Sequence, residues 1–258
     1  MRSYRVVPAS ELLAAVRARR WGQRIPVAIT FDDDLPCHLD HAAPILRDEG
    51  ATATFFLTGI GLEGPGAFWW ERLERAFDEG VIDSEGVRAL TGLEPVPGAT
   101  GARAFAPAIQ QLPPPEKERV SQALLERLGG DPQDTGLRAG QIRQLADQGF
   151  EIGFHTRDHD ELTSLGDDAL ERAMVEGRDA VERAAGRSLA TIAYPHGAAD
   201  ERVATAAREA GYTAGFTTTS EAIDERTNPL LIGRLYPTYD SADRFALTLA
   251  RALASTSR

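Results

Sequence analysis

The sequence predicts an α/β fold in which helices cover both faces of a parallel sheet. Strand-like runs alternate with helical stretches along the 258 residues, and turn residues separate them. Such alternation is typical of strands that lie parallel in one sheet. The strand-like runs are also nearly all apolar, which is expected when both faces of a sheet are covered. In folds of this kind, functional side chains gather at the carboxyl ends of the strands.

The individual elements follow from these patterns. Strands are predicted, in chain order, at residues 26–31, 52–58, 150–155, 189–194, 213–218 and 230–235. Helices are predicted at residues 40–49, 139–148, 167–185 and 201–210, and a final helix near residues 241–254.

One segment, residues 80–136, interrupts the alternation. It is rich in Gly, Pro and Ala, with EPVPG at residues 94–98 and LPPP at residues 112–115, and a helix is predicted at residues 116–128. Long irregular segments in compact domains are often lids or binding loops. We therefore expect one domain over residues 1–258, with its core at about residues 25–240 and an insertion at about residues 80–136 that covers one rim.

Composition excludes several classes of protein. With 28 Lys plus Arg against 39 Asp plus Glu, the net charge is −11, which disfavours binding to nucleic acid or to anionic membrane surfaces. The single cysteine, Cys37, excludes an internal disulfide framework and a zinc site of several cysteines. The sequence contains no run of 18 apolar residues, so no membrane span is predicted. The N-terminal residues lack the apolar stretch of a signal peptide, so we expect a cytoplasmic protein.

Two polar clusters at strand ends indicate a metal site. Asp32, Asp33 and Asp34 close the first predicted strand, and three adjacent carboxylates destabilise a fold unless a cation or hydrogen-bond donors compensate them. A helix N-terminus, the simpler explanation, would account for one of them. His155 and His159 close the third predicted strand. Two histidines and a carboxylate leave a fourth position open on a catalytic metal, usually zinc, with iron, cobalt, manganese or nickel as alternatives.

A third cluster follows the fourth predicted strand. Tyr194, Pro195, His196 and Gly197 form a tight turn that can direct backbone N–H groups into a cleft. Such donors can stabilise an oxyanion, although turns of this composition are common.

Three motifs in these clusters resemble those of a known family. TFDD at residues 30–33, HTRDH at residues 155–159 and YPHG at residues 194–197 are similar to the first three motifs of the polysaccharide deacetylases, the NodB-homology enzymes of carbohydrate esterase family 4. The likeness spans about residues 25–235 and is weakest at residues 80–136.

The resemblance implies a fold and a set of roles. The fold would be a distorted (β/α) barrel of about seven strands, and the reaction a metal-dependent removal of an acyl group. Asp32 matches the family's catalytic base, and Asp33, His155 and His159 match its metal ligands. The residue at the position of His196 offers its backbone N–H to the oxyanion.

The chain departs from the family pattern at three places. Asp34 replaces the usual Gly and adds a charge near the expected metal. The late Leu-x-His motif, which supplies the family's general acid, is missing. The corresponding stretch carries Arg234 and resembles relatives with an Arg at this place, so we expect Arg234, together with the turn at residues 194–197, among the groups that contact the substrate or the oxyanion. Ala193 lies near the place of a third-motif Arg. His196 is one candidate for the missing acid, and Asp32 acting as both base and acid is the other.

Three functions remain open from the sequence. The first is deacetylation of an intracellular N-acetylated sugar or glycoconjugate. The second is hydrolysis of another C–N amide, such as a formamide or a cyclic ureide, by the same residues. The third is a catalytically impaired carbohydrate-binding homologue, which the complete set of Asp32, Asp33, His155 and His159 disfavours. A second metal site at Cys37, His38, Asp40 and His41 is a weaker hypothesis. The oligomeric state stays open.

Overall fold

A computed structural model describes residues 3–221, 223–236 and 241–255. The chain divides into two compact units, one formed by Met1–Leu62 with Leu137–Arg258 and the other by Glu63–Gly136. No helix of the described residues has the length and apolar character needed to cross a membrane.

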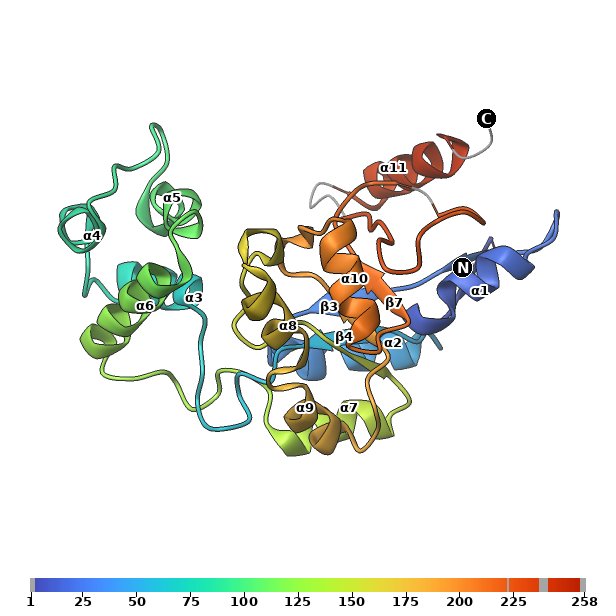
Figure 1. Cartoon of the computed structure of the whole chain (residues 1–258), viewed down its shortest axis with the longest axis horizontal. Helices are drawn as coiled ribbons and strands as arrows, with labels where there is room; N and C mark the ends of the chain where they lie inside the picture. Colours follow the sequence, from blue (N-terminus) through green and yellow to red (C-terminus); the bar gives the residue numbers. More distant parts are fainter. Residues whose placement is uncertain (1–2, 222, 237–240, 256–258) are drawn as a thin grey trace. The chain divides into compact units, whose positions relative to one another are not determined.

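A parallel sheet of five strands forms the centre of the first unit (Figure 1). The strands lie side by side in the order in which they occur in the chain, and the sheet curls into a half-barrel. They are β3 (Thr30–Asp32), β4 (Thr54–Leu57), β5 (Glu151–Phe154), β6 (Thr191–Ala193) and β7 (Ala214–Phe216). Because all five are parallel, their carboxyl ends lie along one edge.

The structure confirms the predicted fold class and differs from the prediction at the first and the last predicted strand. The first predicted strand is divided: β2 (Ile25–Val27) pairs with β1 (Tyr4–Val6) in a separate two-stranded sheet, and β3 joins the main sheet. The last predicted strand forms only one bridge, between Ile232 and Phe216. Five strands in one sheet and two in another agree with the expected number of about seven for the described residues.

Helices of the first unit fall where periodicity predicts them, with one division. These helices are α2 (Ala43–Asp48), α7 (Ala139–Asp147), α10 (Glu201–Glu209) and α11 (Ala242–Ser255). The predicted helix at residues 167–185 is instead two helices, α8 (Asp167–Val175) and α9 (Arg178–Ala185). Gly177 separates them because its φ of 81° is left-handed, a conformation that an α-helix does not contain.

Both faces of the sheet are buried, as the apolar strands predict. Phe55 lies in a cluster with Ile142 of α7 and Val203 of α10, whereas the next residue, Phe56, packs on the opposite face. There it contacts the cluster that contains Leu12 of α1 (Ala9–Ala18), a helix that the sequence analysis did not predict. All four residues of β4 are therefore buried.

The second unit has a helical core of its own. Its helices are α3 (Trp69–Asp78), α4 (Ser84–Thr91), α5 (Ala106–Gln110) and α6 (Pro114–Leu128). Leu73, Phe105 and Leu124 are buried together in this core. Arg72 donates two hydrogen bonds to Asp131, at 3.0 and 2.6 Å, which join α3 to the end of the unit. The segment predicted as an insertion, at about residues 80–136, lies within this unit, which begins at Glu63 and is mainly helical.

Candidate metal centre

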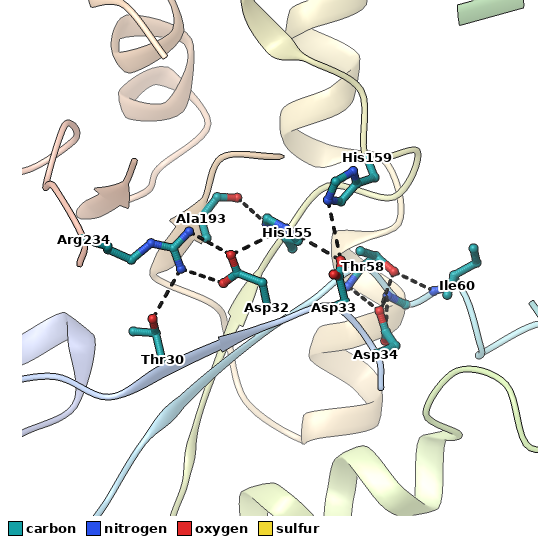
Figure 2. A network of polar contacts seen from close by, with 11 residues as sticks. Thr30, Asp32, Asp33, Asp34, Thr58, Ile60, His155, His159, Ala193 and Arg234 are labelled. Atoms are coloured by element: carbon teal, nitrogen blue, oxygen red, sulfur yellow. Dashed lines mark hydrogen bonds and ion pairs between the residues drawn. The ribbon is translucent and has the colours of Figure 1, made fainter. Parts of the chain in front are cut away.

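Three potential ligands meet at the carboxyl edge of the sheet (Figure 2). Asp33 follows β3, and His155 and His159 follow β5. One ligand atom from each residue lies within 4.8 Å of the other two. Of the described residues, these are the only group of this kind. The structure therefore brings together the three residues that the sequence analysis assigned to the metal.

The imidazole of His155 is oriented by a backbone carbonyl. Its Nδ1 lies 2.8 Å from the carbonyl oxygen of Ala193 at the end of β6. A carbonyl only accepts hydrogen bonds, so Nδ1 carries the hydrogen and Nε2 keeps its lone pair. Nε2 lies 3.8 Å from Oδ1 of Asp33. This arrangement is typical of metal-binding histidines, whose second nitrogen donates to a fixed acceptor.

Asp33 presents an oxygen that suits a cation. Its Oδ1 is buried, accepts no hydrogen bond from the described residues and lies 3.6 Å from Nε2 of His159. Burial raises the pKa of Asp33 to about 6; the nearby His155 opposes this rise, and the negative charges of Asp32 and Asp34 add to it. A buried carboxylate oxygen between two imidazole nitrogens lacks only a positive charge, so the donor set fits a divalent metal ion.

Left-handed backbone conformations concentrate at this site. In the described part of the chain, four non-glycine residues have positive φ: Asp33 at 70°, Thr156 at 53°, His159 at 52° and His196 at 58°. Such conformations cost free energy and persist where the surrounding structure holds them, which is often at functional sites. Two of the three ligand candidates therefore have backbone conformations that no pattern in the sequence predicts.

Asp32 has a different partner from Asp33. Both of its carboxylate oxygens accept hydrogen bonds from Arg234, at 2.6 and 2.7 Å, and Oδ2 lies 3.9 Å from Nε2 of His155. Burial alone would raise the pKa of Asp32, but His155 and Arg234 outweigh it and lower the pKa below its usual value. Arg234 also donates to the carbonyl of Thr217 at 3.1 Å. The sequence analysis placed Arg234 among the substrate or oxyanion groups, and the structure adds this bidentate contact with the predicted base.

Asp34 adds its charge close to Asp33, but its side chain has hydrogen-bond partners of its own. Its side chain is buried and turns toward the end of β4 (Figure 2). There it accepts hydrogen bonds from the backbone N–H of Thr58 at 2.8 Å, from the Thr58 hydroxyl, and from the N–H of Gly59 at 3.2 Å. Hydrogen-bond donors, and not a metal ion, compensate this third carboxylate. Thr58 was not singled out from the sequence, and no sequence signal beyond its place at a strand end marks it.

The turn after β6 places one side chain in the core and another beside a ligand candidate. Tyr194 is fully buried, and its hydroxyl donates to the carbonyl of Leu230 at 2.8 Å. Pro195 is also buried, whereas His196 is exposed, and its ring centroid lies 4.6 Å from that of His159. Gly197 has a φ of 69°, and an added Cβ there would lie 2.4 Å from the backbone nitrogen of Thr218. Only His196 of this turn thus presents a solvent-exposed side chain beside a ligand candidate.

The weaker hypothesis of a second metal site finds no support in the described residues. Cys37, Asp40 and His41 are exposed, and they belong to no cluster of potential ligands. His38 is buried, with its ring centroid 5.4 Å from each of the rings of Phe31 and Phe55. His38 therefore belongs to the aromatic packing behind β3.

Several solved structures with the same fold are distant from this chain in sequence. The Streptococcus pyogenes deacetylase PplD in complex with acetate aligns with a TM-score of 0.60 and 16% identity, over 95% of this chain and 79% of that one. A de-N-acetylase from Aggregatibacter actinomycetemcomitans aligns with a TM-score of 0.56 and 15% identity, over 95% of this chain and 84% of that one. IcaB from Ammonifex degensii aligns with a TM-score of 0.55 and 18% identity, over 96% of this chain and 82% of that one. At these identities the likeness shows the fold.

Sequence comparison identifies the family. No curated protein matches this chain. The family described as polysaccharide deacetylase matches residues 21–85 and 121–215, which is more than half of the chain and contains all three ligand candidates. The chain therefore belongs to the polysaccharide deacetylase family.

Proposed function

We propose that this protein is a metal-dependent hydrolase that removes an acetyl group from an N-acetylated sugar or glycoconjugate. The observation that carries the proposal is the separation of two adjacent carboxylates: Asp33 faces two histidines, and Asp32 is held beside them by Arg234. One carboxylate suits metal binding and the other suits proton transfer. Membership of the deacetylase family supports the acyl-transfer chemistry.

Asp33, His155 and His159 would hold the metal. A divalent cation with an open position supplies a Lewis acid that polarises the acyl carbonyl and lowers the pKa of a bound water. Two imidazoles and one carboxylate suit Zn²⁺ best, and Co²⁺, Fe²⁺, Mn²⁺ and Ni²⁺ are the alternatives. The hydrogen bond from His155 to Ala193 fixes the ring so that Nε2 faces this position.

Asp32 is proposed as the general base. Its Oδ2 lies 3.9 Å from Nε2 of His155, so the carboxylate is close to the ligands without belonging to their group. The contact with Arg234 keeps Asp32 ionised and fixes its plane, so it can accept a proton from the attacking water. The lowered pKa makes it a weak base that stays ready to act under mildly acidic conditions.

The turn after β6 is proposed to complete the site. The backbone N–H of His196 would stabilise the oxyanion, with Tyr194, Pro195 and Gly197 shaping the turn that presents it. The exposed ring of His196, which contacts the ring of His159, is the proposed proton donor to the leaving amine. Asp32, once protonated, is the alternative donor.

Two solved structures with this fold and the ligand set bear on the class of substrate. One solved structure with this fold is a deacetylase in complex with acetate, and another is a de-N-acetylase, which supports an N-acetyl substrate for this chain. Hydrolysis of a formamide or cyclic ureide gains no specific support from the site. The complete ligand set disfavours a purely carbohydrate-binding role. The expected cytoplasmic location stays a prediction.

Metal content separates the proposed roles of the two carboxylates. Asp33→Asn and His155→Ala should lose bound metal and activity together, whereas Asp32→Asn should lose activity and keep the metal. Purified variants are measured by atomic emission for metal content and by acetate release for activity. Retained metal in Asp33→Asn and His155→Ala would show that these residues are not ligands.

A further inference from the structure

We propose that Asp34 and Thr58 form a clamp that positions Asp33 for metal binding. The Asp34–Thr58 clamp consists of the Asp34 carboxylate, the hydroxyl and N–H of Thr58, and the N–H of Gly59. The inference rests on the proposed function, because Asp33 acts there as a ligand. It assigns a positioning role to two residues that lie outside the ligand set.

The clamp extends the contact between two strands beyond the end of their ladder. Pairing of β3 with β4 ends at Asp32, which lies opposite Phe56. The next residue, Asp33, leaves the extended conformation with a φ of 70°. Asp34 is 2% exposed, and its side chain reaches the end of the neighbouring strand, β4. There its carboxylate accepts a hydrogen bond from the N–H of Thr58 at 2.8 Å. Two residues beyond the ladder, a side chain thus replaces the backbone pairing.

Asp33 is consequently fixed from both sides. The strand ladder and Arg234 hold Asp32 before it, and the clamp holds Asp34 after it. A left-handed conformation is unfavourable for a non-glycine residue and persists where neighbouring contacts enforce it. The Oδ1 of Asp33 accepts no hydrogen bond from the described residues. The backbone on either side, rather than a bond to this oxygen, therefore determines where it points.

Local chemistry directs the clamp's donors toward Asp34. The Thr58 oxygen accepts a hydrogen bond from the N–H of Ile60 at 3.1 Å, so its own hydrogen is available for the carboxylate. Gly59 has a φ of 80°, and an added Cβ would lie 2.9 Å from a methyl group of Val181. The turn that offers the Gly59 N–H thus requires glycine. The family usually has glycine at the position of Asp34. A glycine there would leave these donors without their acceptor.

The binding of Zn²⁺ to metal-free protein tests the clamp without relying on activity. Thr58→Val removes the hydroxyl and keeps the shape, and Thr58→Ser restores the hydroxyl; Asp34→Gly removes the acceptor. Isothermal titration calorimetry should give about 10–100-fold weaker Zn²⁺ binding for Thr58→Val and Asp34→Gly, as for other residues that orient metal ligands. Thr58→Ser should bind like the wild type. Ile142→Val, a buried change in α7, controls for lost stability.

Zn²⁺ binding by the Thr58 variants can also overturn the proposed role of the clamp. If Thr58→Val melts at a lower temperature, as Ile142→Val does, yet binds Zn²⁺ as tightly as the wild type, the contact is merely structural and the proposal is wrong. The Thr58 pair decides this even if Asp34→Gly does not fold. Asp33→Asn tells the two proposals apart: unchanged Zn²⁺ binding in that variant overturns the ligand assignment itself, and the clamp with it.

Discussion

Replacing Arg234 by Met should change both stability and pH dependence. The Arg234 and Asp32 side chains are 12% and 21% exposed, and the variant leaves Asp32 with a buried charge and no guanidinium. Breaking a buried ion pair in this way costs about 3–5 kcal/mol, and the partial exposure places our expectation near the lower value, about 3 kcal/mol. Against the effect of burial, His155 and Arg234 lower the pKa of Asp32, so the loss of Arg234 should raise that pKa.

The sign of the resulting pH effect follows from the role of the base. Asp32 must be ionised to accept a proton, so activity falls as pH drops below its pKa. The acidic limb of the kcat/KM profile should therefore move to higher pH in Arg234→Met. The profile is measured at saturating metal, with metal content checked at each pH, and chemical denaturation gives the change in stability.

A matched arginine provides the control. Arg178 is 16% exposed and lies 3.1 Å from Glu182, so Arg178→Met removes a similar ion pair away from the site. It should lower stability and leave the acidic limb unchanged. An unchanged acidic limb in Arg234→Met, with the metal retained, would refute the reasoning, because the ionisation of Asp32 would then not limit the reaction.

Three further changes test other parts of the structure. His196→Ala should lower kcat and alter its basic limb; an unimpaired kcat across the pH range would rule out the acid role. His38 has its pKa lowered to about 4 by burial, so its contribution to stability is present above pH 6.5 and is lost as pH falls toward 4, by about 3 kcal/mol in total. His38→Phe should reduce this acid sensitivity in denaturation curves, and an unchanged curve would contradict the assignment. Gly197→Ala should cost about 2–4 kcal/mol, because it adds a clash at Thr218 to the strain of positive φ. Gly211→Ala shares the positive φ without a close contact and should cost less; equal losses in thermal melts would show that the clash is absent.

The sequence predicted the parts of this fold that repeat a local pattern. Apolar runs marked the strands of the main sheet, and polar residues at their ends marked the site, because parallel strands bring their carboxyl ends to one edge. Asp33 lies far from His155 and His159 in the chain, yet this rule predicted that a carboxylate at the end of the first strand would meet the two histidines, and the resemblance to the family selected Asp33. Periodicity also located α7 and α10 to within a residue.

Other features depended on contacts that no local pattern encodes. Asp34 shares its residue type with Asp32 and Asp33, but its orientation is decided by donors on β4. The pairing of Arg234 with Asp32 joins residues separated by about two hundred positions. The positive φ of His159 depends on the turn that carries it, because histidine, although enriched in that conformation, adopts it in only a minority of cases. Gly177 was a sequence signal for the division between α8 and α9. Because the helical periodicity continues on both sides of it, a single helix was predicted there.

Release of acetate by the metal-reconstituted protein tests the central claim most directly. Metal-free wild type, wild type loaded with Zn²⁺ and Zn²⁺-loaded Asp32→Asn are each incubated with N-acetylglucosamine oligomers, and acetate is measured enzymatically. We predict acetate release only from the loaded wild type, with Asp32→Asn inactive although it binds the metal. Equal release from loaded Asp32→Asn, or from metal-free wild type, would contradict the account of a metal-dependent deacetylase with Asp32 as its base.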